Sequence, residues 1–150
     1  MQPVTVDADV FGVRTAVRRI SADLGFGRVA QAELVIVASE LASNILKYGR
    51  RGEVAVRAFY DESGRAGIEI AARDRGPPIR DFVLAQRDGF TDEGPIDPAL
   101  LLRRRGIGAG LGAVARLSDR VHYRAEDDGK TIIAQRYLRR ASWRPPRRAG

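Results

Sequence analysis

Residues 39–45 read Ser-Glu-Leu-Ala-Ser-Asn-Ile and lie near the end of a long apolar stretch that runs from about Arg28 to Tyr48. The spacing of its apolar residues predicts a helix that is apolar on more than one side, as expected of a central helix. Glu40 and Asn44 stand four residues apart, so they lie one turn apart on the same face of this helix. Taken alone, such a pair more often belongs to a solvated face than to a functional site.

The segments on either side of this helix predict an α+β domain. The expected order of helices and strands favours a two-layer α/β sandwich, with helices on one face of a mixed, mostly antiparallel sheet. The expected elements are a strand at 2–6, helices at 7–24 and 28–48, strands at 53–60 and 68–74, short helices at 81–88 and 97–103, a helix at 110–117, and strands at 120–125 and 131–138.

Asp74 is the next candidate, at the end of the second strand. Ile68, Ile70 and Ala72 alternate with other residues along this strand, so counting two further places Asp74 on the same apolar face. A carboxylate directed at the core must find hydrogen-bond donors or a ligand. Asp74 is followed by the turn-forming residues 75–78, Arg-Gly-Pro-Pro.

Glycines are concentrated in residues 106–112, Gly-Ile-Gly-Ala-Gly-Leu-Gly, just before an expected helix. Free backbone N–H groups of such a segment form a nest for anions, and the N-terminus of a helix favours phosphate. The segment lacks the lysine of a Walker motif and the preceding strand of a dinucleotide fold. By itself it is therefore a weak signal.

Together these features describe an ATP pocket. Mg²⁺ prefers oxygen ligands and keeps several waters, so one amide oxygen such as that of Asn44, together with phosphates, suffices to hold it. Glu40, one turn away, can accept a proton from an attacking hydroxyl or water. Asp74 can accept a hydrogen bond from an exocyclic amine such as adenine N6.

The same segments resemble the motifs of the GHKL (Bergerat-fold) ATPase superfamily. Residues 40–45 look like its N box, residues 74–77 resemble its D-x-G-x-G box, residues 106–112 its second glycine box, and residues 128–131 its last glycine-threonine element. Within the superfamily the chain resembles the small bacterial serine/threonine kinases of partner-switching systems, of the stressosome type, and the resemblance covers about residues 8–138.

This resemblance implies a role for each matching residue. Glu40 would be the catalytic base toward a substrate Ser or Thr, Asn44 the Mg²⁺ ligand, and Asp74 the acceptor for the adenine amine. The implied lid and pocket residues are Gly76, which would allow close approach of the nucleotide, Gly106, Gly108, Gly110, Leu111 and Gly112, which would face the phosphates, and Thr131, which would line the adenine end. The implied cofactors are ATP and Mg²⁺. The implied partners are STAS-domain proteins, as substrate and scaffold, and a downstream phosphatase of the PP2C type.

Two departures from the family pattern bear on nucleotide affinity. Pro78 stands where the family has a second glycine, and proline has no N–H and a fixed φ. Residues 91–105 lengthen the lid, and this insert is expected to contain a helix that covers the pocket. Its three arginines at 103–105 suit a γ-phosphate or a solvated face, and its leucines at 100–102 suit the core or a partner.

Composition excludes several other classes of function. The chain has no cysteine and a single histidine, His122, which we place on the outer face of a strand; a Ser-His-Asp triad or a multi-histidine metal site is therefore not expected. No secretory signal is recognisable, and no apolar run is expected to reach the roughly 20 residues that span a membrane. The expected location is the cytoplasm.

The net charge of +7 is unevenly distributed. Residues 139–150 contain five arginines and no acid, which leaves 21 basic against 19 acidic residues in 1–138, a balance of +2. We therefore divide the chain into a kinase domain at 1–138 and a basic tail at 139–150. This distribution does not favour nucleic acid as a partner of the domain.

Two other functions are compatible with the same fold. One is an anti-sigma factor that sequesters a sigma factor and phosphorylates its antagonist. The other is a non-catalytic module that binds partners, its pocket impaired by Pro78. Retention of Glu40, Asn44 and Asp74 together argues against the second, because an inactive pocket need not keep all three.

Overall fold

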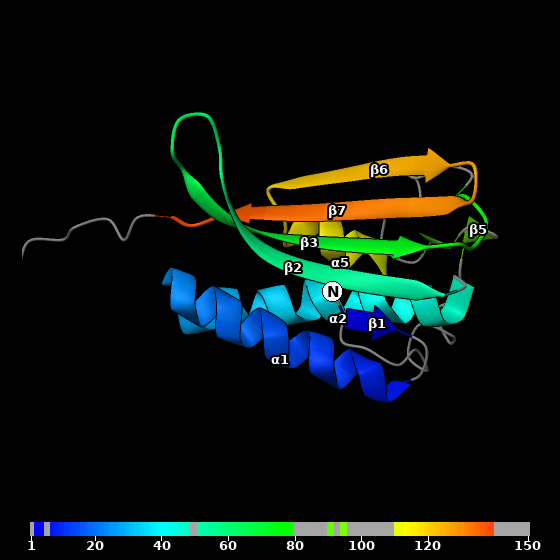
Figure 1. Ribbon diagram of the computed structural model, residues 1–150, viewed down its shortest axis with the longest axis horizontal. Helices are drawn as coiled ribbons and strands as arrows, with labels where there is room; N and C mark the ends of the chain where they lie inside the picture. Colours follow the sequence, from blue (N-terminus) through cyan, green and yellow to red (C-terminus); the bar gives the residue numbers. More distant parts are fainter. Residues whose placement is uncertain are drawn as a thin grey trace, which may run out of the picture.

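The computed structural model describes residues 2–4, 7–48, 51–79, 90–91, 94–95 and 110–139. The predicted two-layer α/β sandwich is confirmed: the helices lie on one side of a five-stranded sheet (Figure 1). The elements are β1 (Gln2–Val4), α1 (Asp7–Leu24), α2 (Arg28–Tyr48), β2 (Gly52–Tyr60), β3 (Ala66–Asp74), β4 (Phe90–Thr91), β5 (Gly94–Pro95), α5 (Leu111–Arg116), β6 (Arg120–Glu126) and β7 (Gly129–Tyr137).

The first helix follows its amphipathic pattern. Val13 and Val17 are completely buried, and the chain leaves the helix through Gly25, whose φ of 96° is a conformation that glycine adopts without strain. The N–H of Gly25 donates to the carbonyl of Ala22, and the N–H of Phe26 donates to that of Ser21. These bonds satisfy carbonyls at the helix end, and the helix predicted at 7–24 is confirmed.

The main sheet has the strand order β1-β2-β3-β7-β6. All its described strand pairs are antiparallel, so the parallel component that a mixed sheet would require is not found among the described residues. The predicted strand boundaries agree with the observed ones to within about two residues, apart from the strand predicted at 2–6, which ends at Val4. Residues 90–91 and 94–95 pair as a separate two-stranded ribbon that was not predicted. The short helices predicted at 81–88 and 97–103 lie outside the described residues.

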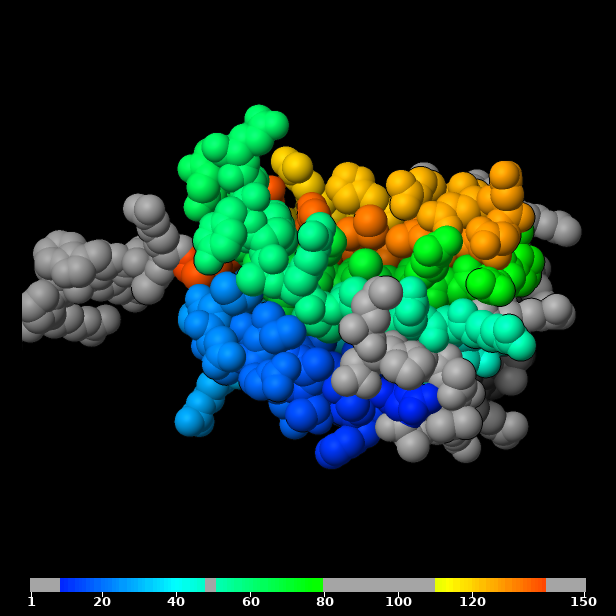
Figure 2. Space-filling view, in the orientation of Figure 1, coloured from blue at the N-terminus to red at the C-terminus, as the bar shows by residue number. Residues whose placement is uncertain are grey.

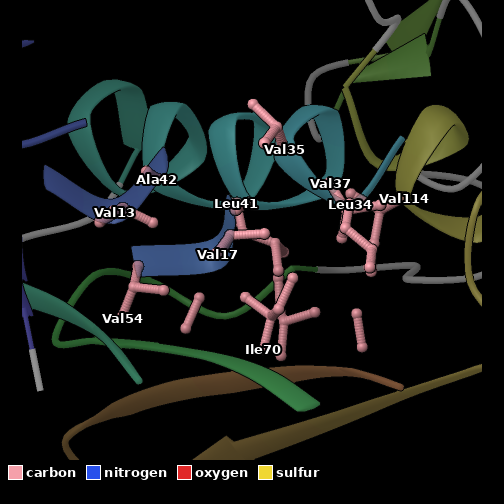
Figure 3. Close-up of a cluster of buried hydrophobic side chains, with 14 of the residues drawn as sticks. Val13, Val17, Leu34, Val35, Val37, Leu41, Ala42, Val54, Ile70 and Val114 are labelled. Carbon is pink, nitrogen blue, oxygen red and sulfur yellow. The ribbon is translucent and has the colours of Figure 1, made fainter. Parts of the chain in front are cut away.

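The hydrophobic core fills the space between the helices and the sheet. Leu41 of α2 and Ile70 of β3 point toward one another across this boundary (Figure 3), and both are essentially inaccessible to solvent. Val114 of α5 joins the same cluster, so the short helix is packed against α2 and does not stand alone. Burial of this apolar surface is the main stabilising contribution to the fold.

The apolar stretch of helix α2 is longer than expected from the sequence. Its residues 28–47 are long and apolar enough to cross a membrane by length and composition, contrary to the expectation that no such run exists. In the structure one side of this helix packs on the sheet and another on α1, as a central core helix does. Figure 2 shows α1 in blue covering the helical side, with β6 and β7 in orange on the opposite side.

The outer face of the sheet carries a polar cluster around Glu69, which is 7% exposed. The Arg57 guanidinium donates to Oε1 at 2.9 Å, and the Gln135 amide donates to Oε2 at 2.7 Å. Burial alone would raise the pKa of Glu69, but the hydrogen bonds from Arg57 and Gln135 outweigh it and hold the pKa below its ordinary value of 4.5.

Glu69 is therefore expected to make the free energy of unfolding depend on pH. Because its pKa is lower in the folded state, its contribution is complete above the unfolded value and is lost as the pH falls through the folded value. Glu69→Gln should lower the free energy of unfolding at pH 7 by about 1 kcal/mol, since Arg57 is largely exposed and its attraction is screened. Urea denaturation at pH 7 and pH 3 measures this effect. The prediction would be contradicted if the free energy of unfolding of the variant fell between pH 7 and pH 3 by as much as that of the wild type.

Candidate active site

A polar stripe runs along α2 beside the stripe that faces the sheet. Glu33, Glu40 and Asn44 follow one another at spacings of seven and four residues, so they share this side of the helix. Glu33 accepts a hydrogen bond from the Arg136 guanidinium of β7, with Nη1 and Oε2 2.6 Å apart. This ion pair turns the polar stripe toward the β7 half of the sheet.

Glu40 and Asn44 differ in exposure within this stripe. The Glu40 side chain is 9% exposed and Asn44 is half-buried. The flanking residues Leu41 and Ile45 are buried against the sheet and fix the rotation of the helix. The predicted pair is therefore brought to one face, with the Glu40 side chain largely buried.

Asp74 lies on the helix-facing side of the sheet, as the alternation of β3 predicts. It is 3% exposed, and its Oδ1 accepts two hydrogen bonds. One comes from the N–H of Gly76 at 2.6 Å, which closes a tight turn, and the other from the Lys130 ammonium at 3.0 Å. The expectation that this inward carboxylate finds donors is confirmed.

Lys130 is the functional candidate that the sequence analysis missed. It is paired with Asp74 across β3 and β7, and it is only 1% exposed. Its Nζ lies 3.0 Å from Asp74 Oδ1 and 3.0 Å from the carbonyl oxygen of Pro77. The alternation of β7 could have revealed it, because Ile132 and Ala134 point inward and Lys130 lies two residues before Ile132.

The loop after Asp74 is fixed at both ends. The Lys130 ammonium donates a hydrogen bond to the carbonyl of Pro77, and the N–H of Ile79 donates to the Tyr123 hydroxyl at 2.9 Å. Gly76 is buried inside the loop, and Pro78 is exposed. A side chain at Gly129 would place Cβ 2.0 Å from the carbonyl oxygen of Asp74, so only glycine allows β7 to begin this close to the loop.

Thr131 is not brought together with Asp74. It pairs with Arg73 in β3, so its side chain lies on the outer face of the sheet, and its hydroxyl is 3.2 Å from Glu126 Oε1. Glu126 also pairs with Arg73 and Arg124 on that face. Within the glycine-threonine motif at 128–131, Lys130 is the residue whose side chain lies on the inner face of the sheet. His122 is exposed on the outer face, as predicted.

The glycine-rich segment is described only at its end. Gly106 and Gly108 lie outside the described residues, as do the arginines at 103–105. Gly110 has a φ of 67° and directly precedes α5, whose first residues Leu111 and Gly112 are buried. Leu111 belongs to the hydrophobic core cluster, so this end of the segment is anchored beside α2.

The side chains available as ligands limit how a metal ion could be bound. No group of three or more His, Cys, Asp or Glu side chains gathers into a metal site in the parts of the chain that the structure describes. A cation held by Asn44 would therefore take its other ligands from a nucleotide and from water, which is the mode that Mg²⁺ prefers. The half-buried amide of Asn44, one turn from Glu40, fits that requirement.

A small cavity of about 240 Å³ opens at the same end of the sheet. Asp74 forms part of its wall. Its other lining residues are Arg51, Glu53, Arg73 and Arg75. Three of the five lining residues are arginines and two are acidic, and the register of β2 and β3 places Glu53 and Arg73 on the outer face of the sheet, opposite to the Asp74 side chain.

Comparisons with known proteins agree with this fold. A family model described as the histidine kinase-like ATPase domain matches residues 4–136. The chain is 34% identical over 137 residues to the serine/threonine-protein kinase RsbT of Bacillus subtilis (strain 168), which covers 91% of this chain and 94% of that protein.

Two solved structures share the fold at low sequence identity. The crystal structure of the RsbU and RsbW domains of Rv1364c from Mycobacterium tuberculosis superposes with a TM-score of 0.59 at 16% identity, over 97% of this chain and 34% of that one. This chain thus spans about a third of that protein. The SiaB–SiaC complex from Pseudomonas aeruginosa gives a TM-score of 0.52 at 15% identity, over 92% of this chain and 88% of that one.

Proposed function

We propose, because this chain belongs to the histidine kinase-like ATPase domain family, that it is an ATP-dependent protein serine/threonine kinase of a partner-switching pathway. The observation that carries the proposal is the buried carboxylate of Asp74 on the helix-facing side of the sheet. The polar stripe of α2 faces the same half of the molecule, so an adenine and a triphosphate could be bound together between these elements.

The adenine would be bound at Asp74. The 2.6 Å hydrogen bond from Gly76 and the ammonium of Lys130 both use Oδ1. Oδ2 is then the acceptor to which an exocyclic amine can donate. The loop at 74–79 is already fixed by its own hydrogen bonds, so little ordering is required when the base binds.

The phosphates would lie along the α2 stripe, with the glycines at 106–112 as their cover. Mg²⁺, when bound, would neutralise charge that develops on the phosphates. Asn44 would supply its amide oxygen as the protein ligand. Glu40 would accept the proton of the attacking Ser or Thr hydroxyl of the protein substrate, and its buried position raises the effect of this carboxylate on the reacting atoms.

The partners proposed are a STAS-domain protein, as substrate and scaffold, and a PP2C-type phosphatase that is bound afterwards. Identity of 34% to the serine/threonine-protein kinase RsbT over 91% of this chain supports the kinase part of the proposal. The same fold occurs in the structure of the RsbU and RsbW domains of Rv1364c and in the SiaB–SiaC complex, which is compatible with a domain that binds other proteins. A sigma factor as partner would instead favour the anti-sigma alternative.

The proposal is tested by phosphoryl transfer from γ-labelled ATP to the STAS-domain proteins of the organism that encodes this chain. We expect Mg²⁺-dependent labelling of one Ser or Thr, and a loss of roughly 100-fold in Asn44→Ala, because this variant removes one group that positions the charge. Ser43→Ala, next to Asn44 but on another side of α2, is the matched control and should retain the wild-type rate.

Three outcomes would count against this function. Labelling that is equally fast in Asn44→Ala would remove Asn44 from the site. ATP binding without labelling of any STAS-domain protein would favour a non-catalytic module. A stable complex with a sigma factor, recovered from the native host, would favour the anti-sigma alternative.

A further inference from the structure

The buried lysine is the feature that the proposed function leaves unexplained. Lys130 is the largest of the fully buried side chains in the described part of the chain, and lysines are almost never buried without a partner. Desolvating both charges of a Lys–Asp pair is costly, and a well-packed apolar pair can be as stable. Stability alone is therefore a weak reason for a lysine at this position.

The hydrogen-bond geometry suggests a second use for the ammonium group. An ammonium has three N–H donors, and within the described ranges two of them are accounted for by Asp74 Oδ1 and the Pro77 carbonyl. On its side of the pair, Asp74 uses Oδ1 for both Gly76 and Lys130. Within the described residues, Oδ2 of Asp74 and the third N–H of Lys130 Nζ are therefore the acceptor and the donor that remain for a ligand.

This acceptor and donor are complementary to one edge of adenine. On the Watson–Crick edge of adenine, the 6-amino group is a donor and the neighbouring N1 is an acceptor. Guanine and hypoxanthine reverse both positions, with an oxygen at position 6 and an N–H at position 1. They would direct an acceptor at the carboxylate and a donor at the ammonium.

We infer that Lys130 donates a hydrogen bond to N1 of the adenine whose amine is bound by Asp74, and that the pair selects adenine over 6-oxopurines. The inference rests on the proposed function, because it requires adenine at Asp74. Both groups are almost completely buried, so a mismatched base leaves a buried donor and a buried acceptor unpaired. Such sites discriminate strongly.

The test compares nucleotides on the unmodified protein. Titration with ATP and with 1-deaza-ATP, in which N1 is replaced by C–H and the amine is kept, isolates the proposed contact. Loss of a hydrogen bond from a charged donor should weaken binding of 1-deaza-ATP by about tenfold or more. Inosine triphosphate, which lacks the amine and carries N1–H, should bind still more weakly.

The variant Lys130→Met adds a second comparison. It should bind ATP and 1-deaza-ATP equally, because the donor that distinguishes them is gone. Because this variant removes the counter-charge of Asp74 and is expected to be less stable, the comparison on wild-type protein decides by itself.

Two results would overturn the inference, and they are distinguishable. Equal wild-type affinity for ATP and 1-deaza-ATP, with weak binding of inosine triphosphate, would remove Lys130 from the base-binding site and leave adenine at Asp74. Equal binding of all three nucleotides, or no binding of ATP, would show that adenine is not recognised at Asp74, and the proposed nucleotide site would fail with it.

Discussion

Replacing Glu40 by Gln is expected to slow phosphoryl transfer by about 10²- to 10⁴-fold, while the affinity for Mg·ATP stays close to that of the wild type. The amide has nearly the same shape as the carboxylate but cannot accept the substrate proton. Because Glu40 is assigned to the hydroxyl and not to the nucleotide, the loss should appear in the transfer rate. Single-turnover transfer of labelled phosphate to the STAS-domain substrate, beside an ATP titration, separates the two effects.

Glu33→Gln is the matched control for this experiment. Glu33 lies on the same stripe of α2, seven residues before Glu40, and its carboxylate forms an ion pair with Arg136. Its substitution makes the same chemical change outside the proposed reacting centre and should leave the transfer rate unchanged. A Glu40→Gln variant that transfers phosphate at the wild-type rate would exclude Glu40 as the base.

Lys130→Met is expected to lower the free energy of unfolding by roughly 3–5 kcal/mol. The substitution removes the counter-charge of Asp74 and leaves a carboxylate that is 3% exposed with only the Gly76 N–H as a described donor. Methionine fills much of the volume of the lysine stem, so the loss reports mainly on the unpaired charge. Urea denaturation at pH 7 measures it, provided that the transition is two-state.

The double variant Asp74→Asn/Lys130→Met separates charge from packing. An amide needs no counter-charge, so the double variant should be more stable than Lys130→Met alone. Lys47 is the other lysine of the chain and is exposed at the end of α2, so Lys47→Met should change stability by less than about 0.5 kcal/mol. Equal losses in Lys130→Met and Lys47→Met would contradict a buried ion pair.

The parts of the fold that could be predicted are those in which one periodic pattern determines one element. Val13 and Val17 repeat at helical spacing and are buried, and the alternation that ends at Asp74 places this carboxylate on the inner face. In both cases burial of a continuous apolar stripe fixes the orientation of the element, so the side of each polar residue follows.

What the sequence did not reveal depends on pairing between strands. The glycine-threonine motif drew attention to Thr131, but the register Asp74↔Lys130 puts the preceding residue beside Asp74 and turns Thr131 outward. A shift by one residue reverses the face of every side chain in a strand, and the pairing is set by segments far apart in the chain. Glu69 is a similar case, because the side chains that cover it come from β2 and β7.

The central claim is that this domain binds Mg·ATP between α2 and the Asp74 end of the sheet. The most direct measurement is a calorimetric titration of the protein with ATP, in Mg²⁺ and in excess chelator, beside Asn44→Ala and the Ser43→Ala control. We predict saturable binding that is Mg²⁺-dependent, unchanged in Ser43→Ala and at least roughly tenfold weaker in Asn44→Ala. Absence of binding up to millimolar ATP, or equal affinity in Asn44→Ala, would contradict the account.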